Sequence, residues 1–208
     1  PEPYRLVEGY VKDRKTNQPL KAEILFEDDS TSFLISKTTS DSSGYYRTQL
    51  PVSRPVNGTA ITPGYLYGTE ELMIKARDTT RVGFFLDSIR RGSKVILYNI
   101  HFQPNKDIIL PNSASDLERL LAFLKKEEDW EIRIIGHSNN NVFAGASYLQ
   151  KLSFNRAVSV KRYLVSNGIS PVRISCAGMG GKSPLVDTRD PYEGLKNLRV
   201  EIVLEKRT

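Results

Sequence analysis

Two short segments in the second half of the chain carry side chains that could hold a charged ligand. The first, Gly136–Asn139, reads Gly-His-Ser-Asn and offers an imidazole, a hydroxyl and an amide in consecutive positions. The second contains Ser153 and Arg156. A guanidinium forms paired hydrogen bonds with a carboxylate, and the free N–H groups at a helix N-terminus also favour an anion. If Ser153 caps a helix, Arg156 lies in its first turn, and the pattern predicts a carboxylate site there.

The same residues also have a simpler interpretation. Arg156 could be an exposed arginine on a helix surface, where this residue type is common. His137 and Ser138 are adjacent on or beside a strand, so their side chains diverge and do not form a catalytic couple. His101 is the only other histidine, and no metal-ligand spacing is present. We therefore expect no catalytic residue, no metal site, no cofactor and no enzymatic activity.

Residues 93–208 alternate between strand and helix patterns. Leucines at i, i+3, i+4 and i+7 predict a helix that begins with a capping box at Ser115–Glu118. A second helix is expected from near Ser153 to a left-handed stop at Asn167-Gly168. The β-α-β-α-β-β order predicts an α+β domain with two helices on one small mixed sheet. Its predicted strands cover residues 94–102, 131–135, 172–176 and 199–205.

This order of elements should bring three segments together at one end of the sheet. They are the strand exit at Phe102–Asn105, the strand exit at His137–Asn141, and the helix start at Ser153–Arg156. In the last strand, Val200 and Ile202 alternate with charged residues, which is typical of a sheet with one covered face. The candidate binding residues are therefore expected at the edge of the sheet where these loops meet.

Residues 1–92 have the pattern of an all-β domain. Short runs of β-branched and aromatic residues alternate with turn clusters, and no helical period is visible. Asp41 and Gly44 predict a tight hairpin, and Pro19 fixes another turn. A small β-sandwich is expected here, with the boundary near residues 88–93. Its predicted strands cover residues 4–11, 22–26, 33–37, 45–50, 72–75 and 82–86.

Composition restricts the classes of protein and partner. The net charge is +6, and residues 1–92 and 93–208 carry formal charges of +1 and +5. The basic residues are scattered without an aromatic stacking platform, so no nucleic-acid partner is expected. No apolar run approaches the ~20 residues of a membrane-spanning helix. The single cysteine, Cys176, is expected to be a core residue, and the Pro-Glu-Pro start suggests a mature or excised fragment.

Motifs distributed over nearly all of the second half resemble the OmpA-like C-terminal domain. The resemblance runs from about Tyr98 to Glu205. It rests on Ile100-His-Phe102, Leu110-Pro111, Ile134-Ile-Gly-His137, Leu152-Ser153, Asn155-Arg-Ala157, Gly178-Met-Gly180, Ser183-Pro184 and Arg199-Val-Glu-Ile202.

What this resemblance implies is non-covalent binding of the peptidoglycan stem peptide. Members of the family recognise diaminopimelate, which carries an ammonium and a carboxylate on one carbon. The family's arginine binds the carboxylate and corresponds to Arg156, and the family's acid binds the ammonium and corresponds to Asn139. Ser138 keeps the hydroxyl of the family's threonine. Asn105, after Phe102, stands where the family often has a ligand-contacting polar residue.

Three positions depart from the family pattern. Asn139 is an amide where the family has an acid, so it brings no charge to the ammonium side. Leu149 and Leu198 replace an asparagine and an arginine. Loss of the charged partner is expected to cost about 1–3 kcal/mol of binding free energy.

The first half resembles the carboxypeptidase-regulatory-like fold, a transthyretin-like β-sandwich. The matching residues are Gly9–Asp13, Asn17–Leu20, Thr39–Tyr46 and Leu50-Pro51. This domain order is similar to the tail of PorE-like envelope lipoproteins of type IX secretion. Two hypotheses follow for the chain: a wall anchor on the periplasmic side of the outer membrane, or a protein-interaction module of an envelope complex that lost wall binding.

Overall fold

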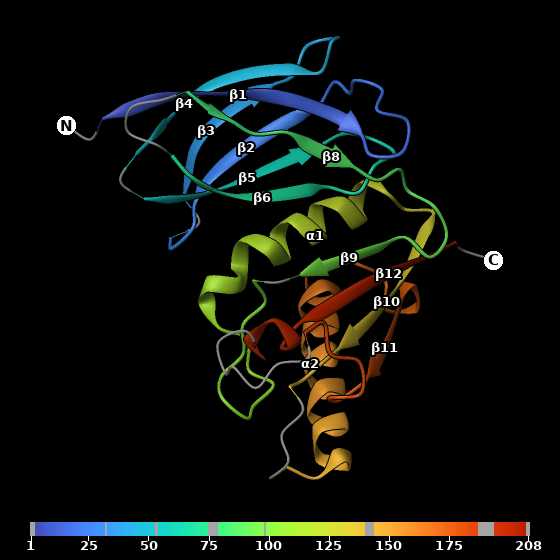
Figure 1. Ribbon diagram of the computed structural model, residues 1–208. Helices are drawn as coiled ribbons and strands as arrows, with labels where there is room; N and C mark the ends of the chain where they lie inside the picture. The colour runs from blue at the N-terminus through green and yellow to red at the C-terminus, as the bar shows by residue number, and fades with distance from the viewer. Residues whose placement is uncertain are drawn as a thin grey trace. The chain divides into compact units, whose positions relative to one another are not determined.

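The computed structural model describes residues 3–31, 33–52, 54–74, 79–97, 99–139, 144–186 and 194–206. The chain forms two compact units, Pro1–Ile89 and Arg90–Thr208. Figure 1 shows that the first contains strands and that the second combines strands with two long helices.

The first unit consists of two four-stranded sheets. In one sheet β1 pairs antiparallel with β4 and parallel with both β7 and β8. In the other the order is β3-β2-β5-β6, and all neighbours are antiparallel. The strands are β1 (Tyr4–Asp13), β2 (Glu23–Asp28), β3 (Leu34–Thr39), β4 (Tyr45–Pro51), β5 (Pro55–Ile61), β6 (Gly68–Met73), β7 (Thr80–Arg81) and β8 (Phe84–Leu86).

Side chains from both sheets share one hydrophobic core. Val7 and Tyr46 from the first sheet and Phe26 and Val56 from the second are at most 1% exposed. This confirms the all-β prediction, because strands with alternate buried side chains enclose the core between two sheets. The predicted hairpin at Asp41 is also present, with Oδ1 of Asp41 accepting hydrogen bonds from the N–H groups of Ser43 and Tyr45.

Strand β5 was not predicted, although it is the most buried strand of its sheet. Pro55, Asn57 and Gly58 disfavour a strand in the sequence, and this run is not among the predicted strands. Gly58 is needed because a Cβ there would lie 2.9 Å from the rings of Phe26 and Phe84. Asn57 is 8% exposed inside the strand, so the Asn-Gly-Thr pattern does not mark an accessible glycosylation site.

The second unit is built on the sheet β11-β10-β12-β9. β10 pairs parallel with β11, and β12 pairs antiparallel with both β10 and β9. This mixed sheet with two helices confirms the predicted α+β architecture. The elements are β9 (Lys94–Leu97), η1 (Pro111–Ser113), α1 (Ala114–Lys126), β10 (Trp130–Gly136), α2 (Ala146–Ser166), η2 (Pro171–Arg173), β11 (Ile174–Gly178), η3 (Leu195–Asn197) and β12 (Val200–Lys206).

Both helices begin earlier than predicted. α1 starts at Ala114 after Ser113, so Ser115 lies inside the first turn and the predicted capping box is wrong. α2 starts at Ala146, and Ser153 and Arg156 lie two turns or more inside it. Residues 146–152 extend the helix because Leu149 continues its buried face one turn before Ser153. The predicted C-terminal stop is confirmed by Gly168, whose φ is +100°.

α2 packs against β10 and β11, the two strands labelled beside it in Figure 1, and its backbone lies close to two glycines of the sheet. A Cβ on Gly136 would lie 2.0 Å from the carbonyl oxygen of Ser153, and one on Gly178 would lie 2.5 Å from that of Gln150. The hydroxyl of Ser153 accepts a hydrogen bond from the N–H of Gly180. The glycines therefore act as packing positions that fix α2, and with it Arg156, on the sheet.

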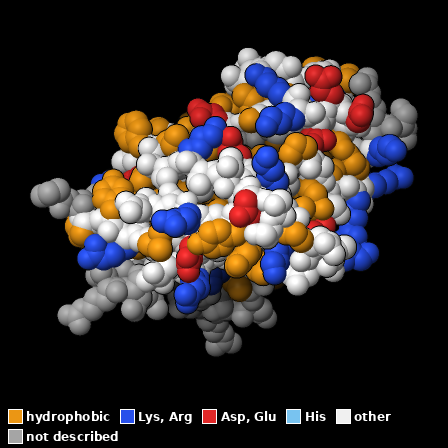
Figure 2. Space-filling model, turned by 90° about the horizontal axis from the view of Figure 1, so that it is seen from above, with side chains coloured by type: hydrophobic (Ala, Val, Ile, Leu, Met, Phe, Trp, Pro, Cys, Tyr) orange, Lys and Arg blue, Asp and Glu red, His pale blue; other side chains and the backbone are white. Residues whose placement is uncertain are grey.

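The described surface carries both kinds of charge. On the face shown in Figure 2, Lys and Arg side chains lie among Asp, Glu and hydrophobic side chains. None of the helices within the described ranges is long and apolar enough to cross a membrane.

Candidate functional site

Arg156 is a buried arginine on the inner side of α2. It is 8% exposed, so the interpretation of it as an exposed helix arginine is wrong. Its Nε donates a hydrogen bond to the carbonyl oxygen of Lys106 (3.0 Å), and its guanidinium carbon lies 5.0 Å from the centre of the Phe102 ring. Burial lowers the pKa of Arg156, while nearby Tyr148 and Asp107 raise it. Arginine stays charged despite such shifts, so a cation is held at this position.

The N-terminal dipole of α2 does not contribute to this site. Because Arg156 lies in the interior of the helix, the N–H groups around it are used in intrahelical bonds. The sequence-based argument from a helix N-terminus is therefore wrong, and the cation alone remains as the anion-binding group. No described residue accepts a hydrogen bond from its two Nη groups, which leaves the bidentate edge of the guanidinium for a ligand.

The loop between Phe102 and Ile109 forms the wall opposite Arg156. Phe102 pairs with Ile109 in an isolated bridge, and Gln103 N donates to the carbonyl oxygen of Ile108. Asn105 is exposed at the tip with φ of +56°, a left-handed conformation that asparagine tolerates better than most residues. This turn aims the carbonyl oxygen of Lys106 at the guanidinium, so Phe102, Asn105 and Arg156 belong to one neighbourhood.

Ser138 and Asn139 follow β10 and make different contacts. Ser138 is 4% exposed, its N–H donates to the carbonyl oxygen of Gly180, and its hydroxyl has no partner among the described residues. The amide oxygen of Asn139 accepts a long hydrogen bond (3.4 Å) from Nδ2 of Asn197. A Cβ on Gly194 would lie 2.7 Å from Nδ2 of Asn139. The amide of Asn139 is therefore directed toward the segment around Asn197.

The structure brings some of the predicted site residues together and leaves others apart. Arg156 and Phe102 are in direct contact, with Asn105 beside them. Within the described ranges, no hydrogen bond or ion pair joins Arg156 to Asn139. Residues 140–143, which include the predicted strand exit at Asn141, lie outside the described residues.

A second cluster of charged side chains lies on the sheet and was predicted incorrectly. Arg199 and Glu201 were expected on the solvent face of β12, but they are 5% and 3% exposed. Both Nε and Nη2 of Arg199 donate to Oε1 of Glu201 (2.9 and 2.6 Å), and Lys94 Nζ lies 2.7 Å from Oε2. His137 Nε2 lies 3.4 Å from Oε1. Alternation along one strand cannot reveal that neighbouring segments cover the second face.

The cluster shifts two pKa values in the same direction. Burial lowers the pKa of His137 below 6.5, Arg199 lowers it further, and Glu201 only partly opposes this. Burial raises the pKa of Glu201, but hydrogen bonds from Lys94 and Arg199 outweigh this effect and hold it below 4.5. Both groups are therefore harder to protonate in the folded protein than in the unfolded chain.

We expect acid to destabilise the second unit, beginning near neutral pH. Below about pH 6.5 the unfolded chain protonates His137 while the folded protein does not, so the free energy of unfolding falls as pH falls. Glu201 adds a further loss below about pH 4.5. Fluorescence of Trp130, the only tryptophan, monitors unfolding of this unit. The melting temperature should depend less on pH between 7.5 and 5.5 in His137→Gln than in the wild type. An unchanged pH dependence in that variant would contradict the assignment of this effect to His137.

Neither the cysteine nor the possible metal ligands form a second functional site among the described residues. Cys176 is half-buried, and burial raises the pKa of its thiol, which makes it a poor nucleophile. No group of three or more His, Cys, Asp or Glu side chains within the described ranges could hold a metal ion.

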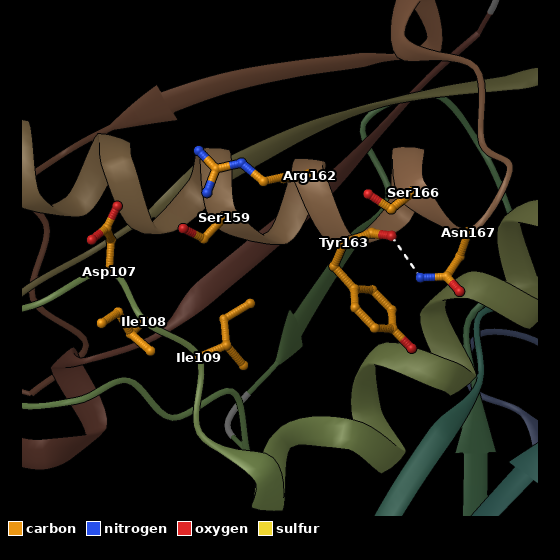
Figure 3. Close-up of a pocket in the computed structure, with 8 residues that line it drawn as sticks. All are labelled: Asp107, Ile108, Ile109, Ser159, Arg162, Tyr163, Ser166 and Asn167. Atoms are coloured by element: carbon orange, nitrogen blue, oxygen red, sulfur yellow. Dashed lines mark hydrogen bonds between the residues drawn. The ribbon is translucent and has the colours of Figure 1, made fainter.

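A groove that sequence reasoning missed lies one turn further along α2 (Figure 3). Its volume is about 420 Å³, in the range of small-molecule sites. The loop contributes Asp107, Ile108 and Ile109, and the helix contributes Ser159 and Tyr163 among others. Asp107 and Ser159 lie at the same end of the groove. The only sequence signal for this groove was Asp107, an acid two residues after the predicted site segment Phe102–Asn105.

Comparison with known proteins identifies the part of the chain that carries Arg156. Residues 101–197 match the model of the OmpA family. This part of the chain is an OmpA-like domain. Outer membrane porin F of Pseudomonas fluorescens is 32% identical over 107 residues, covering 51% of this chain and 32% of that protein. Peptidoglycan-binding protein ArfA of Mycobacterium tuberculosis is 32% identical over 96 residues, covering 46% of this chain and 29% of that protein.

The chain therefore spans about a third of the length of these two relatives. The periplasmic domain of Helicobacter pylori MotB has the same fold, with a TM-score of 0.50 and 21% identity over 58% of this chain and 87% of that one. The family and these relatives are named for outer-membrane and peptidoglycan-binding proteins, which supports the expectation that the OmpA-like part of the chain is not an enzyme.

Proposed function

We propose that the OmpA-like domain binds the stem peptide of peptidoglycan through diaminopimelate and so anchors a protein or complex of the outer membrane to the cell wall. The observation that carries this proposal is Arg156, a buried cation stacked on Phe102 with its Nη edge unused by the described residues. A cation held in this way is preorganised for a carboxylate, because little side-chain entropy remains to be lost on binding. A relative named for peptidoglycan binding supports the choice of ligand.

Under this proposal Arg156 binds the carboxylate of the ligand, and the residues near it complete the site. The ring of Phe102 stacks against the guanidinium, and Asn105 is exposed on the same loop. Ser138 has a hydroxyl without a partner among the described residues, which suits a hydrogen bond to the ligand. Asn139 supplies an amide oxygen without charge. The expected location is the periplasmic side of the outer membrane in a bacterial envelope, as the porin relative suggests.

Calorimetry with a diaminopimelate-containing stem peptide tests the proposal. Arg156→Ala should weaken binding roughly tenfold to a hundredfold, because it removes two charge-assisted hydrogen bonds. Arg156→Lys should recover part of the loss, since it keeps the charge without the bidentate geometry. Arg133→Ala is the matched control, because it removes an exposed arginine from the same unit. Absence of binding to the full chain at millimolar peptide would reject the proposal.

One observation favours a second candidate function. The amide of Asn139 is engaged with Asn197 and lies against Gly194, away from any described contact with Arg156. This arrangement suits an interaction module that kept the fold and lost the wall ligand. The first unit would then be a transthyretin-like, carboxypeptidase-regulatory-like sandwich in an envelope complex such as type IX secretion. Tighter binding of the stem peptide by Asn139→Asp would favour the wall anchor over this alternative.

A further inference from the structure

The groove beside Arg156 contains an acid that has no described partner. Asp107 is half-buried, and within the described ranges it forms no ion pair and no hydrogen bond through its side chain. It directly follows Lys106, whose carbonyl oxygen accepts the hydrogen bond from Nε of Arg156. In Figure 3 its carboxylate points toward α2. A partly desolvated carboxylate without a partner is costly, and a cationic ligand group would offset that cost.

Asp107 is close to Arg156 without being paired to it. The acid acts electrostatically on Arg156, yet no ion pair forms between them. Ser159, which lines the same end of the groove, lies three residues after Arg156 and hence on the same face of α2. The guanidinium of Arg156 therefore lies near Asp107, beside the end of the groove that Asp107 and Ser159 line.

The rest of the groove is lined by apolar side chains and by three polar ones, Arg162, Ser166 and Asn167. Ile108 and Ile109 line it from the loop, and Tyr163 lines it from the helix. Ile108 is 49% exposed, which is high for an isoleucine and indicates a surface available for contact. Asp107 with Arg156 beside it, and the apolar side chains that follow along the groove, match a ligand with an amino-acid head and an aliphatic chain.

We propose that Asp107 binds the ammonium of the ligand whose carboxylate Arg156 holds, and that the aliphatic chain of the ligand lies in the groove along Ile108, Ile109 and Tyr163. This inference rests on the proposed function of Arg156 and names a different acid for the same ligand. Asp107 lies on the loop after Phe102, whereas Asn139 lies after β10. The uncharged Asn139 then removes no essential charge, because the acid is supplied from the loop.

Two ligands with the same carbon skeleton test this role on the 208-residue chain. meso-Diaminopimelate carries two ammonium groups, and pimelate carries none. The wild-type protein should prefer diaminopimelate over pimelate by about tenfold, and Asp107→Asn should lose that preference. The variant should bind diaminopimelate about tenfold more weakly and pimelate as tightly as the wild type or more so. Asp129→Asn is the control, since it removes an exposed acid at the opposite end of β10.

The outcomes separate the two proposals. If Asp107→Asn binds diaminopimelate as the wild type does, the role of Asp107 is rejected and the proposed function stands. If the variant weakens both ligands equally, Asp107 only supports the loop, which also rejects the role. If the wild-type protein binds neither compound, both proposals fail. Unchanged Trp130 fluorescence and melting temperature in Asp107→Asn establish that the variant is folded.

Discussion

Gly136→Ala is expected to destabilise the second unit by about 3 kcal/mol or more. The new Cβ would lie 2.0 Å from the carbonyl oxygen and 2.8 Å from the carbonyl carbon of Ser153. Both atoms belong to the backbone in the interior of α2, so no rotamer change can relieve the overlap. The helix has to move away from β10, which opens the packing of Ala157 and Val160, both fully buried.

Urea unfolding followed by Trp130 fluorescence measures this loss in the unit concerned. Gly145→Ala is the matched control, because a Cβ at Gly145 meets nothing within 4 Å. It should change the free energy of unfolding by less than about 0.5 kcal/mol. Wild-type stability in Gly136→Ala would contradict the close approach of α2 to the sheet. A loss in that variant would also weaken ligand binding, since α2 positions Arg156.

Glu201→Ala is expected to cost about 3–5 kcal/mol of stability. Glu201 accepts two hydrogen bonds from Arg199 and forms an ion pair with Lys94. Without the carboxylate, the guanidinium of Arg199 stays 5% exposed with only the carbonyl oxygen of Ser183 as a described partner. An uncompensated buried charge is what makes the loss of one partner so costly.

Glu205→Ala provides the comparison on the same strand. The side chain of Glu205 is 38% exposed and pairs with Arg133, whose side chain is 48% exposed, so its loss should cost less than about 1 kcal/mol. The double variant Arg199→Met/Glu201→Leu should recover most of the stability, because apolar side chains of similar volume avoid the desolvation cost. Equal effects of Glu201→Ala and Glu205→Ala would show that the cluster is not buried as described.

The buried cluster also explains why the prediction of a single covered face for β12 was wrong. Val200 and Ile202 alternate with Arg199 and Glu201, and alternation normally separates a buried face from a solvated one. Here both faces are covered at this end of β12, and the charges pair with each other instead of with water. Such pairing depends on segments far apart in the chain, namely Lys94, His137 and Ser183. A pattern along one strand carries no information about them.

The four residues of the Gly136–Asn139 motif each have a different role. Gly136 is a packing position for α2, and His137 lies beside a buried charge cluster. Ser138 stays a candidate for ligand contact, and Asn139 is engaged with Asn197. The two residues that the proposals rely on most, Arg156 and Asp107, lie outside the motif, on α2 and on the loop after Phe102.

By itself the sequence determined the class of each half, the order of elements in the second unit and the OmpA-like motifs, because these follow from local periodicity and turn residues. It also singled out Arg156, since a guanidinium is the residue type that binds a carboxylate bidentately. Only the tertiary structure decided that Arg156 is buried in mid-helix, that β5 is a strand, and that Asp107 lines the adjoining groove. These features arise where distant segments meet, because burial and electrostatic contact depend on spatial neighbours and leave no period in the chain.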